Sequence, residues 1–183
     1  MNETLESIKN RRSIRKFEDK ELTKQQIEEI IESGRLAPSA RNDQNWKFIA
    51  VTNKELIKEM SDYVVNIVID NPKYSFVKER KAIIDDPILY SAPAVIFIVA
   101  EEDDKWSTIN CSLAAENMMI YAHSIGIGSC FIGMARFVNE NQELVEKLKV
   151  PQGCVIQATL VFGYADEKPE FKERNKDNVT WID

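Results

Sequence analysis

The strongest constraint on the fold is the apolar run Ala92–Ala100, which is nine residues long. It is too short to span a bilayer, because a membrane helix needs about 20 apolar residues. Within it, the segment 94–100 reads AVIFIVA, which is apolar throughout and rich in β-branched residues. That composition is typical of a buried strand, so the chain must build a sheet around it.

Other segments supply the partners of this strand. Further strands are expected at Trp46–Val51, within Gly126–Gly133 and at Cys154–Phe162. Helices are expected from capping residues and apolar spacing: after a capping box at Thr23 and Gln26, after the caps Asn53 and Asn139, around Val77–Ile84, and over Trp106–Ser124, the longest. Four strands and at least five helices favour an α+β or an α/β domain.

The length of 183 residues favours one domain over 1–183, with a variable excursion at 66–90 and a C-terminal arm at 166–183. The net charge of −6 argues against a general nucleic-acid binder or a binder of anionic membranes. Three cysteines without a CxxC pair, behind a polar N-terminus, indicate reduced thiols in a cytoplasmic protein. No residues have the spacing of a metal site.

Two basic clusters stand out in this acidic chain. Arg11–Lys16 places four cations in six residues, and Lys172, Arg174 and Lys176 follow near the other end. Arginine offers forked donors that match phosphate oxygens, so the clusters together favour an anion site. A solvated surface run is the alternative.

Two loops are candidates for contact with a ligand. Pro38–Trp46 carries amide and hydroxyl groups just before a strand, and Gly126–Gly133 holds three of the six glycines. Amide side chains read the edge of a heterocycle, and glycines let backbone N–H groups approach a flat ligand. Turn chemistry and a helix C-cap are the plainer interpretations. His123, the only histidine, has no GxSxG partner motif to support a catalytic triad.

The order of four motifs resembles the nitroreductase family of FMN-dependent oxidoreductases over nearly the whole chain. The motifs are RRSIRKF, APSARNDQNWKFIAV, NMMIYAHSIGIGSCFIG and the tail FKERNKDNVTW. The resemblance implies an α+β fold with a mostly antiparallel central sheet flanked by helices. It also implies a homodimer with FMN at the interface, in which the C-terminal segment is exchanged between subunits.

The resemblance also implies roles for individual residues. Arg11, Arg12 and Ser13 would bind the FMN phosphate, with Lys172 and Arg174 completing the cage. Arg15 would lie at the pyrimidine edge and support the charge of the reduced ring electrostatically. The partner subunit would contribute Pro38, Ser39, Ala40 and Asn42, Gln44 would lie close to the ring, and backbone at Ile132 and Gly133 would donate to it.

The activity implied by the resemblance is a ping-pong hydride transfer. NADH or NADPH reduces the flavin at N5, and a small electron-poor acceptor such as a nitroaromatic or a quinone takes the electrons. The flavin carries the chemistry, so no catalytic side chain or metal is expected. Alternatives are another flavin chemistry on this scaffold (reductive dehalogenation, dehydrogenation or flavin cleavage), a non-catalytic flavin-binding protein, or an acidic domain with solvated basic runs.

Overall fold

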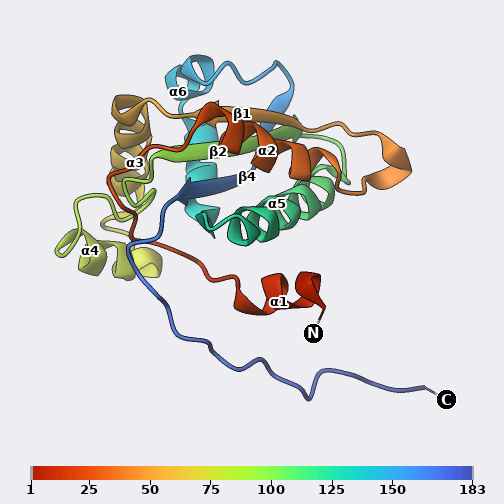
Figure 1. Cartoon of the computed structure of the whole chain (residues 1–183). Coiled ribbons are helices and arrows are strands. Elements are labelled where there is room, and N and C mark those ends of the chain that lie inside the picture. The colour runs from red at the N-terminus through yellow and green to blue at the C-terminus, as the bar shows by residue number, and fades with distance from the viewer. Residues whose placement is uncertain (1, 183) are drawn as a thin grey trace.

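A four-stranded sheet in the order β1-β2-β4-β3 forms the centre of the protein, and every neighbouring pair is antiparallel (Figure 1). The computed structural model describes residues 2–182. The strands are β1 Lys47–Val51, β2 Ala94–Glu101, β3 Gly128–Phe131 and β4 Cys154–Gly163. The helices are α1 Glu3–Asn10, α2 Lys24–Arg35, α3 Lys54–Val68, α4 Ser75–Lys81, α5 Ser107–Ser124 and α6 Gln142–Lys147. Antiparallel pairing throughout makes the fold α+β.

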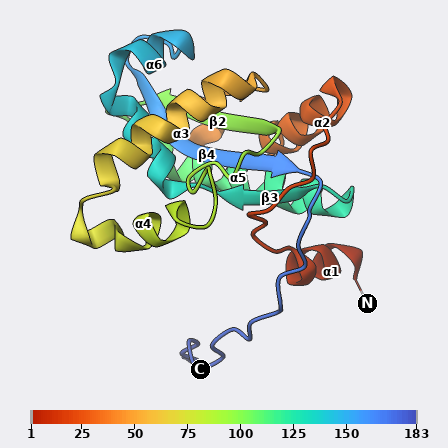
Figure 2. The same ribbon diagram turned by 90° about the vertical axis from the view of Figure 1, so that its left-hand side faces the viewer.

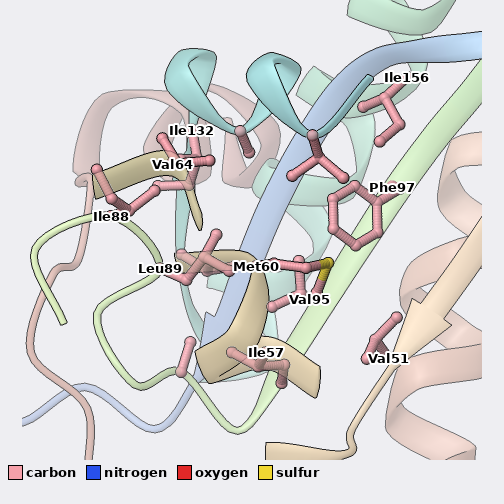
Figure 3. Close-up of a cluster of buried hydrophobic side chains, with 14 of the residues drawn as sticks. Val51, Ile57, Met60, Val64, Ile88, Leu89, Val95, Phe97, Ile132 and Ile156 are labelled. Carbon is pink, nitrogen blue, oxygen red and sulfur yellow. The ribbon is translucent and has the colours of Figure 1, made fainter. Parts of the chain in front are cut away.

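Strand β2 is buried on both faces, as its sequence predicts. On one face Phe97 packs in a core with Met60 of α3, and Figure 3 shows these side chains together. On the other face Ile98 belongs to a second core with Ile30 of α2 and Met118 of α5. Figure 2 looks onto the α3 side, with α5 behind the sheet. Burying each large side chain in these cores contributes about 1.5–3 kcal/mol.

The predicted helix starts are confirmed at two caps. Thr23 and Gln26 form the complete capping box of α2. The Asn53 side chain accepts a hydrogen bond from the Leu56 N–H at 2.7 Å and so begins α3. These side chains satisfy backbone donors that the first helical turn leaves free.

Two predictions for the helices need correction. Asn139 is not a helix cap: its side chain bonds the backbone N–H and carbonyl of Ile156, and Asn141 caps α6 instead. The backbone of β4 at Ile156 therefore competes successfully for the Asn139 amide. The helix expected around Val77–Ile84 runs over Ser75–Lys81, two residues earlier at its start and three at its end.

The basic segment after α1 is extended, so Arg11 and Arg15 do not share a helix face. Ser13 pairs in parallel with Ser129 of β3, and Phe17 pairs antiparallel with Ala165 beyond β4. The Ile14 N–H donates to the Ser129 carbonyl at 2.9 Å. These bonds attach the segment to one end of the sheet.

The C-terminal arm leaves this end of the sheet and extends away from the folded body (Figures 1 and 2). From 166 to 182 it contains no helix and no strand. Its apolar side chains Val179, Trp181 and Ile182 are exposed, Trp181 by 83%. The exchange of this arm between subunits stays a prediction.

No helix within 2–182 has the length and apolar character that crossing a membrane requires.

Gly163 lies where the basic segment crosses the sheet, and its lack of a side chain is required there. A Cβ at Gly163 would lie 2.7 Å from Pro93 Cδ and 2.8 Å from Phe17 Cδ1. Both neighbours are ring atoms that have little freedom to move. We expect Gly163→Ala to lower the free energy of unfolding by about 1–3 kcal/mol, the usual cost of overpacking. Urea denaturation followed by circular dichroism measures it.

Ala165→Ser is the matched control, because Ala165 is exposed and only two residues away. This substitution should change the free energy of unfolding by less than about 0.5 kcal/mol. A Gly163→Ala variant as stable as the parent would contradict the close packing of Phe17 and Pro93 against β4.

Candidate functional site

The extended basic segment separates two cavities at the end of the sheet. The first, which we call the Arg11 cavity, has a volume of about 460 Å³. The second, which we call the Arg15 cavity, has a volume of about 550 Å³. Of the residues predicted from the sequence, Arg11 and Arg12 line the first, and Arg15, Ile132 and Gly133 line the second.

The Arg11 cavity contains buried polar atoms without partners. The Nε atoms of Arg11 and Arg12 and the Oγ atom of Ser129 are buried and make no hydrogen bond within the described residues. Arg12 Nη1 donates to the backbone carbonyl oxygens of Lys9 and Arg11. The nearest carboxylate oxygen to Arg11 Nε belongs to Glu116, at 3.8 Å. Leaving buried donors unpaired costs free energy, which an anion in the cavity would recover.

Glycine at 128 brings β3 against this segment. A Cβ at Gly128 would lie 2.9 Å from Ile14 Cγ1 and 3.1 Å from Ile14 Cβ. Because the two backbones approach so closely, Ser13 reaches its bridge with Ser129, and the neighbouring arginines are held beside the cavity. The Ser129 hydroxyl is a site group that the sequence reasoning missed. Its position in the glycine-rich run was the available signal.

His123 of α5 also lines the Arg11 cavity. Burial lowers its pKa below the usual histidine value, and the positive charges of Arg11 and Arg12 lower it further. The side chain is therefore neutral near pH 7. Because it is the only histidine, its protonation reports directly on the charge in this cavity.

The start of the C-terminal arm is bonded to the basic segment. The Glu167 carboxylate accepts hydrogen bonds from the backbone N–H groups of Arg15 and Lys16. Lys16 Nζ lies 2.6 Å from an oxygen of Asp166, and this ion pair raises the pKa of Lys16. The arm is thus fixed where it passes the Arg11 cavity, which Glu167, Lys168 and Pro169 also line.

Further along the arm, one aromatic side chain returns to the basic segment. The ring of Phe171 lies 4.9 Å from the guanidinium carbon of Arg12, a cation–π contact. Lys172 and Arg174 follow it and are exposed, and neither lines one of the two cavities. The contact of Phe171 with Arg12 therefore brings the second basic cluster near the first, while Lys172 and Arg174 stay outside both cavities.

The Arg15 cavity has a polar and an aromatic wall. Its lining residues are Arg15, Tyr74, Arg80, Ile88, Tyr90, Cys130, Phe131, Ile132, Gly133, Met134, Arg136, Phe137 and Glu140. The Ile132 N–H donates to the Thr159 carbonyl at 2.9 Å, so the predicted pair of backbone donors narrows to Gly133. A Cβ at Gly133 would meet no atom within 4 Å, so the backbone there faces open space.

Tyr90 is a second group that the sequence reasoning missed. Its hydroxyl accepts a hydrogen bond from Arg80 Nη1 at 2.8 Å. Tyr90 and Ser91 both have positive φ, at 59° and 49°, which costs free energy in residues other than glycine. Burial raises the pKa of Tyr90, and the charges of Arg80 and Arg15 oppose the rise.

A buried carboxylate holds Tyr90 in this conformation. Asp86 accepts hydrogen bonds from the Ser61 hydroxyl and from the backbone N–H groups of Ile88, Leu89 and Ser91. Asp86 is therefore the anchor of the turn that carries Tyr90. Cys130 lies in the same cavity, and burial raises the pKa of its thiol.

The predicted polar loop lies elsewhere in this subunit. None of Pro38, Ser39, Ala40, Asn42 and Gln44 lines either cavity. Figure 1 shows the loop between α2 and β1 at the end of the molecule opposite α4.

The loop is held in a strained conformation on α5. The Ala40 N–H donates to Asn110 Oδ1 at 3.0 Å, and the Gln44 N–H donates to Ser39 Oγ. Asn42 and Gln44 have positive φ.

Within residues 2–182, no group of three or more His, Cys, Asp or Glu side chains is arranged to hold a metal ion.

Comparison with known sequences adds a family match. The profile described as the nitroreductase family matches residues 8–164. A protein of Archaeoglobus fulgidus, named as a predicted NADH dehydrogenase/NAD(P)H nitroreductase, is 32% identical over 94% of this chain and 91% of its own length. An FMN reductase (NADPH) of Bacillus subtilis is 32% identical over 90% of this chain and 66% of its own length.

Solved structures show the same fold. A nitroreductase with bound FMN from Bacteroides fragilis superposes with a TM-score of 0.87 at 28% identity, and each chain is covered completely. A nitroreductase with bound FMN from Desulfitobacterium hafniense superposes with a TM-score of 0.89 at 26% identity, again over both whole chains.

The position of His123 predicts how an anion changes its pKa. Inorganic phosphate bound between Arg11 and Arg12 would cancel part of their positive charge, so we expect the lowered pKa of His123 to rise when phosphate is added. An NMR titration of the single imidazole measures it. Arg11→Ala should reduce the rise, and Arg35→Ala, at an exposed position on α2, should not.

The same shift predicts a dependence of stability on pH. Because the folded pKa of His123 is below its unfolded value, the unfolded chain binds more protons as the pH falls. The contribution of His123 to stability is present above about pH 6.5 and is lost as the pH falls through the folded pKa.

In the NMR titration, a His123 pKa that does not change when phosphate is added to the parent protein would contradict the anion site.

Proposed function

The chain belongs to the nitroreductase family and is an FMN-dependent NAD(P)H oxidoreductase, and we propose that it works by a ping-pong cycle on electron-poor acceptors such as nitroaromatics or quinones. The observation that supports this proposal best is the pair of cavities on either side of the basic segment. One offers unpartnered cationic donors, and the other offers a wide, partly aromatic space beside Arg15.

The chemistry of the Arg11 cavity fits the FMN phosphate. The unpaired Nε atoms of Arg11 and Arg12 and the Ser129 hydroxyl are donors that lack partners until an anion enters. We assign Arg11, Arg12 and Ser13 to the phosphate, with Ser129 as an additional donor. Lys172 and Arg174 would complete the cage when the arm is fixed by Phe171 on Arg12.

The Arg15 cavity fits the ring system. Bound FMN supplies the hydride chemistry of the reaction, taking electrons from NAD(P)H and passing them to the acceptor. Arg15 would stabilise the negative charge that reduction adds to the ring, an electrostatic role in a partly enclosed site. A Cβ at Gly133 would meet no atom within 4 Å, and the Gly133 N–H would be the donor to the ring edge. Ile132 would support it through its own bond to Thr159.

A homodimer would complete the site. The loop with Pro38, Ser39, Ala40, Asn42 and Gln44 lies away from both cavities of its own subunit, so it reaches a flavin only across an interface. Two features support an interface: the strained loop is held in place by α5, and the C-terminal arm exposes Trp181 and Ile182 to solvent. An exposed apolar arm of this kind is stabilised by docking on another chain.

The purified protein tests the proposal directly. We expect the absorption spectrum of oxidised FMN, and we expect NADH or NADPH to bleach it under anaerobic conditions. Arg11→Ala should weaken FMN binding by about tenfold, because a charge-assisted hydrogen bond contributes about 1.5–3 kcal/mol. Fluorescence titration of the apoprotein with FMN measures the affinity.

Arg35→Ala is the control for the loss of one positive charge far from the cavities. It should bind FMN as the parent does. A protein that binds no FMN would contradict the proposed function, and an Arg11→Ala variant with unchanged affinity would contradict only the phosphate assignment.

Shortening the arm separates its two proposed roles. A chain ending at Asn178 keeps Lys172 and Arg174 but loses the apolar end Val179–Ile182. We expect this chain to dissociate into monomers at higher protein concentrations than the full chain does, and to lose FMN as it dissociates. Sedimentation velocity and flavin content, measured on the same samples, test the coupling. A monomer that holds stoichiometric FMN would contradict a shared site.

A further inference from the structure

Arg136 lies in the 3₁₀ helix Gly133–Glu140 and lines the Arg15 cavity. Its side chain differs from those of the other two arginines of this cavity in what it contacts. Arg15 is assigned to the flavin, and Arg80 donates to the Tyr90 hydroxyl and lies 5.0 Å from the centre of the Phe76 ring. Within residues 2–182, Arg136 makes no ion pair and no hydrogen bond through its side chain.

The charge around this cavity is opposite to that of the whole chain. The chain carries −6, yet three arginines and one glutamate, Glu140, line the cavity. Glu140 follows Arg136 by four residues in the 3₁₀ helix, and the two do not form an ion pair. The cavity therefore keeps a positive potential, which concentrates anions.

An aromatic pair stands next to Arg136 on the same wall. The rings of Phe137 and Tyr74 meet edge to face, with centroids 5.9 Å apart and an angle of 86°. This contact joins the 66–90 excursion to the 3₁₀ helix and gives the cavity an aromatic wall. A flat ring packs well against such a wall, and a guanidinium binds carboxylates with paired hydrogen bonds.

We propose that Arg136 and the Tyr74–Phe137 pair form an acceptor subsite that selects planar aromatic molecules carrying a carboxylate. This inference rests on the proposed function for the reaction and adds the class of acceptor. The 2′-phosphate of NADPH is also an anion, so it is the alternative ligand for Arg136. Arg136 and Phe137 both line this cavity, so one small molecule bound there can contact both. In NADPH the 2′-phosphate belongs to the adenosine end, remote from the reacting ring.

The test compares 4-nitrobenzoate with 4-nitrobenzamide, which have nearly the same shape and differ in charge. Their dissociation constants for the purified flavoprotein are measured by calorimetry, so the readout does not need turnover. We expect the parent to prefer 4-nitrobenzoate. In Arg136→Gln we expect the affinity for 4-nitrobenzoate to fall about fivefold, the upper range for a partly exposed ion pair, and that for 4-nitrobenzamide to stay unchanged.

Arg35→Gln is the matched control, because it removes the same charge from α2 away from the cavity. It should leave both affinities unchanged. Raising the salt concentration should reduce the preference of the parent and have little effect on Arg136→Gln. A kcat/KM ratio for the two acceptors that falls in Arg136→Gln alone would support the same conclusion during turnover.

Several outcomes would overturn the subsite. They are equal affinities for both probes in the parent, an unchanged 4-nitrobenzoate affinity in Arg136→Gln, equal losses for both probes, or the same loss in Arg35→Gln. A loss of NADP⁺ affinity with unchanged 4-nitrobenzoate affinity would assign Arg136 to the nicotinamide cofactor instead. A protein without flavin that still prefers 4-nitrobenzoate would contradict the proposed function and leave the subsite intact.

Discussion

The backbone pairing between the basic segment and one end of the sheet is the interaction on which both cavities depend. Ser13 pairs with Ser129, and Phe17 pairs with Ala165, so the residues between them run along the ends of β3 and β4. Without these bonds the arginines would be a solvated run, which is the plainer interpretation of their composition. Close packing at Gly128 and Gly163 allows this approach, because a side chain at either position would meet the segment.

The pairing also explains how an acidic chain keeps a cationic site. Glu167 accepts from two backbone N–H groups of the segment, and Glu116 lies 3.8 Å from Arg11 Nε, too far for a hydrogen bond. Arg11 and Arg12 then retain buried nitrogen atoms without partners. The free energy lost by leaving these donors unpaired would be recovered by a bound anion, which supports the proposed phosphate site.

The 66–90 excursion becomes a wall of the Arg15 cavity through two contacts that differ in kind. Asp86 binds three backbone N–H groups and keeps Tyr90 in a conformation that residues other than glycine rarely adopt. Tyr74 packs edge to face on Phe137 and connects the excursion to the 3₁₀ helix. A segment with weak secondary structure is thus ordered by a buried carboxylate and an aromatic pair, and it brings side chains to the site that the motifs do not contain.

The sequence by itself determined the buried strand at 94–100, the helix starts at Thr23 and Asn53, and the basic segment as a candidate anion site. These features depend on local spacing, on caps that act within one helical turn, and on composition. The family resemblance is also carried by short motifs in order along the chain. Only the tertiary structure decided that Asn139 binds Ile156 rather than capping a helix, and that Ser129, Tyr90 and Arg136 line the cavities. Those outcomes depend on contacts between residues distant in the chain and on which donors remain unpaired after folding. A local sequence pattern predicts neither the contacts nor the unpaired donors.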